Sequence, residues 1–100
     1  MLECNEGSFE GWYVIERNGR RINGADIEGT ADDMRTIASA IEQRGFVSCG
    51  RCAVDARQGA HGPEVNLWSP RNSISNTSVS LREADALAAQ IRAKLGGGRC

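Results

Sequence analysis

The chain has 100 residues, of which 40% are hydrophobic and 25% charged, with a net charge of −1. This length fits one domain, and the composition excludes a disordered chain or a fibrous repeat. No apolar run reaches the roughly 20 residues that span a bilayer, and the start, Met1 to Glu6, is acidic where a secretory signal is basic. We therefore expect a single domain, residues 1–100, in the cytoplasm and without membrane contact.

The net charge conceals an asymmetry between the two halves of the chain. Residues 1–50 hold five Arg against nine Asp and Glu, which gives −4, whereas residues 51–100 hold seven basic against four acidic residues, which gives +3. Nucleic-acid-binding domains are usually clearly basic, so this balance favours a charged protein partner over DNA or RNA. The alternative is that both halves mix in the fold and the charges have no joint role.

Residues 11–45 are predicted to form a hairpin followed by a helix. Trp12 to Arg17 is rich in β-formers, Asn18-Gly19 is the strongest two-residue hairpin signal, and Arg20 to Ile27 continues beyond it. Ile22 and Ile27 in the second strand are five residues apart, so in a regular strand they would face opposite sides of the sheet. A bulge near Asn23-Gly24 is therefore expected.

The first helix is predicted over residues 31–44. Thr30 and Asp33 approximate a capping box, in which each side chain bonds the backbone N–H of the other residue. Hydrophobic residues then follow at helical spacing as far as Gly45, a residue type that commonly ends helices.

Residues 64–95 are predicted to form a second hairpin and helix, after a central strand and loop in residues 46–63. Val65 and Leu67 alternate with polar residues, and Ser69 to Asn72 are typical of a turn.

Ser80 and Glu83 match a complete capping box for a helix over residues 81–95. Residues 96–100 are expected to be a flexible tail.

Two hairpin-helix units predict an α+β domain, with one antiparallel sheet of about five strands and two helices on one face. The expected order is ββαβββα, with residues 1–10 as an N-terminal segment outside both units. The caps Thr30 and Ser80 and the helices that follow them match after a shift of 50 residues. Two interpretations stay open, an internal repeat of two ββα units or the general similarity of capped helices.

The spacing of Cys49 and Cys52 is the one in this sequence that suggests metal binding or redox chemistry. In a regular strand these residues face opposite sides and cannot bind one metal ion. If the two residues between them form a tight turn, the thiols oppose each other across a hairpin and provide two zinc ligands. Structural cysteines are expected, with a zinc site or redox chemistry as alternatives. The remaining ordinary Cys and His candidates for zinc are Cys4, His61 and Cys100.

No catalytic residue or cofactor site is predicted. His61 is the only histidine, and no neighbouring nucleophile marks it as a catalytic base. The sequence also has no phosphate-binding loop, no nucleophile elbow and no glycine-rich dinucleotide turn. We therefore expect a protein that is not an enzyme.

The candidates for partner binding are the two tryptophans, which are scarce in this chain, and a few charged residues near them in the sequence. Trp68 is out of register with the apolar residues of its strand and so points outward, beside Arg71, in the manner of an interface anchor. The alternative is a tryptophan that covers a sheet edge. Trp12 and the acidic Glu10 and Glu16 complete the set of candidate partner-binding residues.

The run Gly11 to Arg20, followed by a capped helix, resembles the hairpin-helix units of small proteins from bacteriophages and mobile elements, including some anti-CRISPR proteins. The resemblance covers residues 11–45 and 64–95 and is one of architecture, without a specific motif. It implies a non-enzymatic inhibitor that docks on a bacterial defence complex and blocks target-DNA binding or nuclease recruitment. Many anti-CRISPR proteins are strongly acidic and this chain is not, so the acidic first half offers only a local mimic of DNA.

The leading hypothesis is therefore a protein that inhibits a CRISPR effector in the host cytoplasm without binding nucleic acid itself. The second is a small zinc-containing nucleic-acid-binding module that uses Cys49, Cys52 and arginines of the second half. A third is a domain that scaffolds host proteins. Pairing of edge strands between two copies leaves a homo-oligomer open. The arginines in question are Arg51, Arg57, Arg71 and Arg82.

Overall fold

The computed structural model describes residues 2–7, 9–22, 27–49, 52–57 and 64–96. The α+β class is confirmed, but the order is ββββαββββα instead of ββαβββα. Neither helix within these ranges has the length and apolar character that a membrane crossing requires. The elements are β1 (Leu2–Glu6), β2 (Trp12–Arg17), β3 (Arg20–Arg21), β4 (Ile27–Thr30), α1 (Ala31–Glu42), β5 (Phe46–Ser48), β6 (Ala53–Asp55), β7 (Glu64–Ser69), β8 (Asn72–Ser80) and α2 (Leu81–Leu95).

The strands form two antiparallel sheets, so the prediction of one sheet was wrong. In the first sheet, β2 pairs with β1 on one side and with β3 and β4 on the other. The second sheet has the order β5-β6-β7-β8. Each hairpin thus gains a strand from the segment that precedes it, β1 for the first and β6 for the second.

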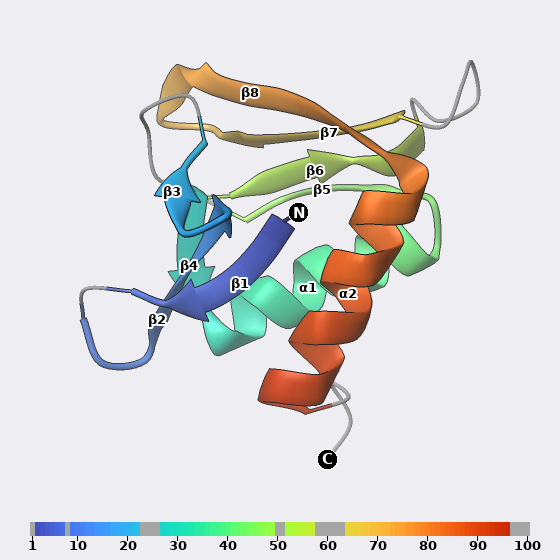
Figure 1. Ribbon diagram of the computed structural model, residues 1–100. Coiled ribbons are helices and arrows are strands. Elements are labelled where there is room, and N and C mark those ends of the chain that lie inside the picture. Colours follow the sequence, from blue (N-terminus) through green and yellow to red (C-terminus); the bar gives the residue numbers. More distant parts are fainter. Residues whose placement is uncertain (1, 8, 23–26, 50–51, 58–63, 97–100) are drawn as a thin grey trace.

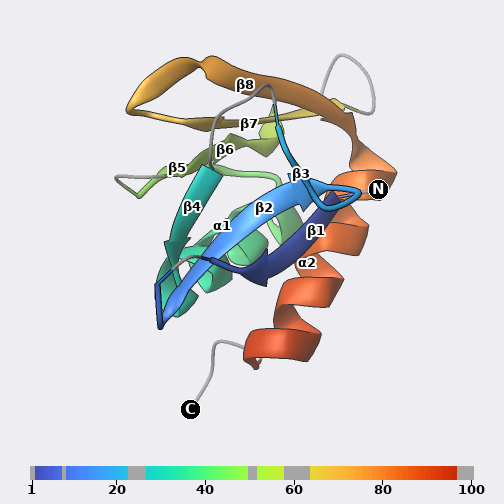
Figure 2. The ribbon, with the colours of Figure 1, turned by 60° about the vertical axis from the view of Figure 1, so that its left-hand side comes forward.

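The two helices lie side by side, below the sheet β5–β8 in Figure 1 and behind β1 and β2 in Figure 2. Helix α1 packs against β4 of the sheet that precedes it and against β5 and β6 of the other. Helix α2 packs against β7, β8 and also β1. Each helix therefore joins the two sheets into one core, instead of covering the face of a single sheet.

The helices run antiparallel, and arginines fix their alignment at both ends. The Arg35 Nη2 atom donates to the carbonyl of Leu95 over 2.8 Å, and the Arg44 Nη1 atom contacts Asp85 Oδ1 at 2.7 Å. The start of α1 thus lies beside the end of α2, and the end of α1 lies beside the start of α2. The hydrogen bond from Arg44 lowers the pKa of the Asp85 carboxyl.

The core lies between the helix pair and the inner sheet faces, and the helical stripes expected from the sequence are confirmed as buried. Alternate residues of the central strands also point inward, as the period of a strand requires. The largest fully buried side chains include Ile15, Ile27, Met34, Ile37, Ile41, Leu67, Leu87 and Ile91.

Strand β1 lies in the segment 1–10, which was expected to stand outside both units. Leu2 and Cys4 are buried and alternate with less buried neighbours. Helix α2 holds the strand in place, because Gln90 accepts a hydrogen bond from the Cys4 N–H and Lys94 Nζ donates to the Cys4 carbonyl over 2.8 Å. These contacts join residues almost a full chain length apart.

The cap predicted for α1 is confirmed, and the cap predicted for α2 is formed only in part. Thr30 and Asp33 form a complete capping box, in which Thr30 Oγ1 accepts from the Asp33 N–H over 3.2 Å and Asp33 Oδ2 accepts from the Thr30 N–H over 3.0 Å. Ser80 accepts from the Glu83 N–H over 3.1 Å, but the Glu83 carboxylate pairs with Arg17 of β2 at 2.9 Å. The complete box predicted at Ser80 was wrong because a tertiary ion pair engages this glutamate.

Helix α1 ends at Glu42, two residues earlier than predicted. Arg44, and not Gly45, takes the left-handed conformation, with φ of 55°. The Arg44 N–H donates to Ile41 O over 3.1 Å and the Gly45 N–H to Ala40 O over 2.8 Å, as in a Schellman motif.

The predicted turns agree with the structure where it describes them. Asn18 and Gly19 have φ of 54° and 80°, the signature of a two-residue hairpin turn with a right-handed strand twist. Ser69 pairs with Asn72, which closes the second predicted turn. The expected bulge at Asn23-Gly24, most of the loop before Glu64 and most of the C-terminal tail lie outside the described residues.

Gly29→Ala should destabilise the protein by about 1–3 kcal/mol, because an added methyl group overpacks a tight site. A Cβ atom at this position would lie 2.7 Å from Asp33 Cβ and 2.8 Å from Asp33 Oδ2. Asp33 would have to move and leave the capping box. Urea denaturation measures the effect, and Gly45→Ala is the control because its Cβ would approach nothing closer than 3.8 Å. Equal midpoints for the two variants would contradict this account of the α1 cap.

Candidate functional site

The outer face of the first sheet combines acidic and apolar side chains. Trp12, Val14 and Glu16 alternate with the fully buried Ile15 and therefore share the side of β2 that faces away from the core. Glu3 lies opposite Glu16 on β1, and Glu28 lies opposite Val14 on β4. We call Glu3, Trp12, Val14, Glu16 and Glu28 the acidic sheet face, and all five are half-buried.

The carboxylates of Glu3 and Glu16 lie directly opposite each other on this face. Like charges in such a cross-strand pair repel. Asn5 reduces the repulsion, since its Nδ2 donates to Glu16 Oε1 over 2.9 Å and lies 3.4 Å from Glu3 Oε1. The acidic sheet face thus carries three carboxylates, those of Glu3, Glu16 and Glu28.

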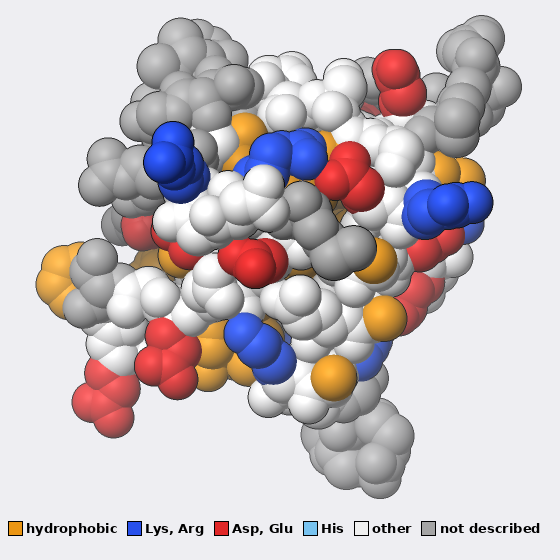
Figure 3. Space-filling model, viewed as in Figure 1, with side chains coloured by type: hydrophobic (Ala, Val, Ile, Leu, Met, Phe, Trp, Pro, Cys, Tyr) orange, Lys and Arg blue, Asp and Glu red, His pale blue; other side chains and the backbone are white. Residues whose placement is uncertain are grey.

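The β1–β2 turn continues the acidic sheet face at its Trp12 end. Phe9 in this turn is 72% exposed. Backbone hydrogen bonds hold the turn, from the Gly7 N–H to Trp12 O over 2.7 Å and from the Trp12 N–H to Phe9 O over 3.1 Å. In Figure 3, hydrophobic and acidic side chains stand together at the left edge, where Figure 1 shows this turn.

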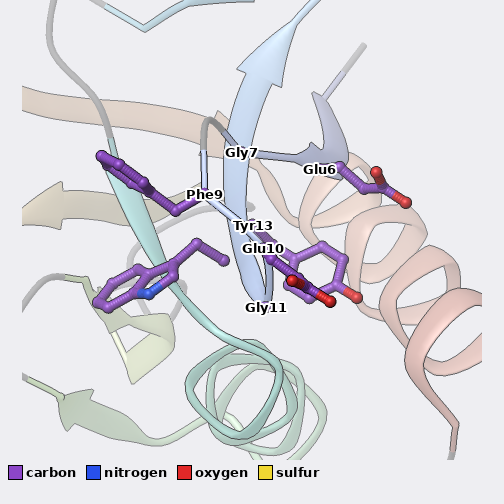
Figure 4. A pocket seen from close by; sticks show the side chains of 7 residues that line it. Glu6, Gly7, Phe9, Glu10, Gly11 and Tyr13 are labelled. Carbon is purple, nitrogen blue, oxygen red and sulfur yellow. The ribbon is translucent and has the colours of Figure 1, made fainter.

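A hollow of about 340 Å³ opens at the same turn. In Figure 4 the Phe9 ring lies on one side of β2, while Glu10, Tyr13 and Glu6 lie on the other. The Tyr13 ring lies on the same side of β2 as the two carboxylates, and this combination suits a cationic group because both attract positive charge. The lining residues are Glu6, Gly7, Phe9, Glu10, Gly11, Trp12 and Tyr13.

The structure therefore brings together three of the residues predicted to bind a partner. Trp12 lies both on the acidic sheet face and in the hollow, Glu10 lies in the hollow, and Glu16 lies farther along the same face. Phe9 was missed by the sequence prediction. Its signal was a lone aromatic residue among polar and glycine residues, where no core strand is expected.

Trp68 and Arg71 belong to the other sheet. The Trp68 ring packs against Phe46, with 6.0 Å between ring centroids, and the Arg57 guanidinium lies 4.9 Å above the Phe46 ring. Arg57 is also paired with Asp55 at 3.1 Å. We call Phe46, Arg57 and Trp68 the aromatic cluster. Arg71 is exposed in the β7–β8 turn.

The cysteine pair lies at the turn between β5 and β6. Ser48 pairs with Ala53, and the Cys49 N–H donates to Cys52 O over 2.9 Å, so the two cysteines are opposite each other. Their Sγ atoms are 2.8 Å apart. Of the two geometries left open by the sequence, the regular strand is thus wrong and the hairpin is confirmed, although residues 50 and 51 lie outside the described ranges.

The two thiols of this pair have different surroundings. Cys49 is half-buried, and the hydrogen bond from Cys52 lowers its pKa. Cys52 is fully buried, and its pKa is raised by that hydrogen bond and by desolvation. Asp33, in the first turn of α1, opposes ionisation of both thiols. Burial also raises the pKa of Cys4 to about 11.

The two thiols thus lie side by side, and a zinc site at this turn would need two further ligands. In the part of the chain that the structure describes, no three His, Cys, Asp or Glu side chains gather around a common point that could hold a metal ion. His61 and Cys100, two of the candidates for the missing ligands, lie outside that part.

No protein-family model matches this sequence, and neither a curated protein nor a solved structure shows significant similarity to it.

Proposed function

We propose that this protein is a non-enzymatic inhibitor that binds another protein through the acidic sheet face and the β1–β2 turn. The observation that carries the proposal is the exposed Phe9 at the end of a half-buried, acidic sheet face that contains Trp12. Aromatic anchors surrounded by charged groups are typical of protein interfaces.

The chemistry of this surface favours a partner with a basic patch. Glu3, Glu16 and Glu28 on the sheet would face Arg and Lys side chains of the partner. Complementary charge speeds association and orients the partner.

We propose a CRISPR effector complex in the cytoplasm of a bacterial host as the target. These effectors hold the guide–target duplex in a positively charged channel. An acidic face that occupies part of this channel would block target-DNA binding. The resemblance of the hairpin-helix units to anti-CRISPR proteins supports the same target class, with a phage or mobile element as the origin.

The test mixes the purified chain with purified effector complexes, treated with nuclease or loaded with guide RNA, and measures co-elution and target-DNA cleavage. We expect a stable, nuclease-resistant complex with one effector type and loss of DNA binding or cleavage. Retention of nucleic acid alone, lost at high salt, would contradict the proposal.

The cysteine pair favours a second candidate, the zinc-containing nucleic-acid-binding module, because its thiols are placed to bind one metal ion. Arg57, one of the arginines assigned to nucleic acid, is instead engaged by Asp55 and Phe46. This second candidate predicts stoichiometric zinc by native mass spectrometry and nucleic-acid binding that weakens steeply with salt.

A further inference from the structure

We propose that Cys49 and Cys52 form a reversible disulfide by exchange with small-molecule disulfides, with Cys49 as the attacking thiol and Cys52 as the resolving thiol. The proposal is independent of the function proposed above, because the pair belongs to the second sheet and does not line the hollow at the β1–β2 turn.

The backbone already has the geometry that a disulfide needs. Directly opposite, hydrogen-bonded residues in antiparallel strands have Cα atoms about 5.5 Å apart, within the usual range for disulfides. Cys49 and Cys52 directly follow the Ser48–Ala53 pair, one backbone hydrogen bond from the Cys49 N–H to Cys52 O joins them over 2.9 Å, and their sulfur atoms are 2.8 Å apart. Bond formation therefore requires only a small approach of the sulfurs.

The difference in burial assigns the two roles. Cys49 is half-buried and open to a small disulfide, whereas Cys52 is fully buried and in contact with the Cys49 sulfur. Cys4 is fully buried beneath α2, so it should not react in the folded protein.

The exchange has two balanced steps. The Cys49 thiolate attacks one sulfur of a disulfide RSSR, which forms a Cys49–SR bond and releases RS⁻. Cys52 then attacks the Cys49 sulfur, which forms the Cys49–Cys52 bond and releases a second RS⁻. The two protons of the cysteine thiols end on the two RSH molecules. The two cysteines are oxidised and one small-molecule disulfide is reduced.

The test equilibrates the chain, with Cys100→Ser to remove a thiol outside the described residues, in glutathione buffers of graded redox ratio. Free thiols are then alkylated and located by peptide mass spectrometry. We expect Cys49 and Cys52 to lose alkylation together as the buffer becomes oxidising, and to recover it with reductant. Cys4 should react only after denaturation.

Two variants separate the roles. Cys52→Ser lacks the resolving thiol, so a glutathione adduct should accumulate on Cys49. Cys49→Ser should collect at least tenfold less adduct on Cys52, because that thiol is buried. Persistence of both free thiols in the folded Cys100→Ser chain at every redox ratio would overturn the proposal. So would stoichiometric zinc that either variant removes, which would identify a metal site.

Discussion

Ile41→Ala or Ile91→Ala should lower the free energy of unfolding by about 2–5 kcal/mol, the range for truncation of large buried aliphatic residues. Both side chains are fully buried in the one hydrophobic core, Ile41 on α1 and Ile91 on α2. Each change removes apolar groups from this core, and the packed surroundings collapse only partly into the space left behind. A domain of this size has about 5–15 kcal/mol of stability in total, so the loss is large.

Urea denaturation followed by circular dichroism measures this loss, and Ile41→Val and Ile91→Val provide a graded control. These smaller truncations should cost about 0.5–1.5 kcal/mol. An alanine variant that is unfolded without urea would still be interpretable, because its valine counterpart keeps the fold. Midpoints unchanged in all four variants would mean that the apolar faces of α1 and α2 are wrongly assigned.

Phe9→Ala should weaken binding to the protein partner about 30-fold or more, equivalent to about 2 kcal/mol, as for an aromatic anchor in an interface. Phe9 is 72% exposed, so its truncation should leave stability unchanged. Glu16→Gln should have a smaller effect, mainly on the association rate and its dependence on salt. Surface plasmon resonance against the captured effector measures both effects.

Phe46→Ala is the matched control, since Phe46 is also an exposed phenylalanine, at 48%, but belongs to the aromatic cluster on the other sheet. It should leave binding unchanged. Trp68→Ala and Arg71→Ala test the other sequence-based candidates in the same assay. If these variants lose binding and Phe9→Ala does not, the interface lies on the second sheet, and the proposed role of the acidic sheet face is wrong.

The candidate site was predictable in part. Trp12, Glu10 and Glu16 were proposed from residue type, and strand alternation alone places Trp12 and Glu16 on one side of β2. The contributions of Glu3 and Glu28 could not be predicted in this way. They reach the same face through the pairing of β1 and β4 with β2, and register between strands depends on contacts distant in sequence.

The sequence by itself determined the elements whose signals are local: both helices and their apolar stripes, the Thr30 cap, the turn at Asn18-Gly19 and the turn closed by Ser69 and Asn72. These features depend on side-chain periodicity and on backbone preferences within a few residues, so distant packing seldom alters them.

Only the tertiary structure decided how the strands are divided between two sheets and which geometry the cysteine pair adopts. Strand β1 pairs with β2, the next strand in the chain, and is also held by α2 near the other end of the chain. The Glu83 carboxylate forms an ion pair with Arg17 instead of completing the capping box. Cys49 meets Cys52 because β5 pairs with β6. For β1 and Glu83, contacts with residues distant in sequence select the observed arrangement, and for the cysteine pair the pairing of β5 with β6 does so.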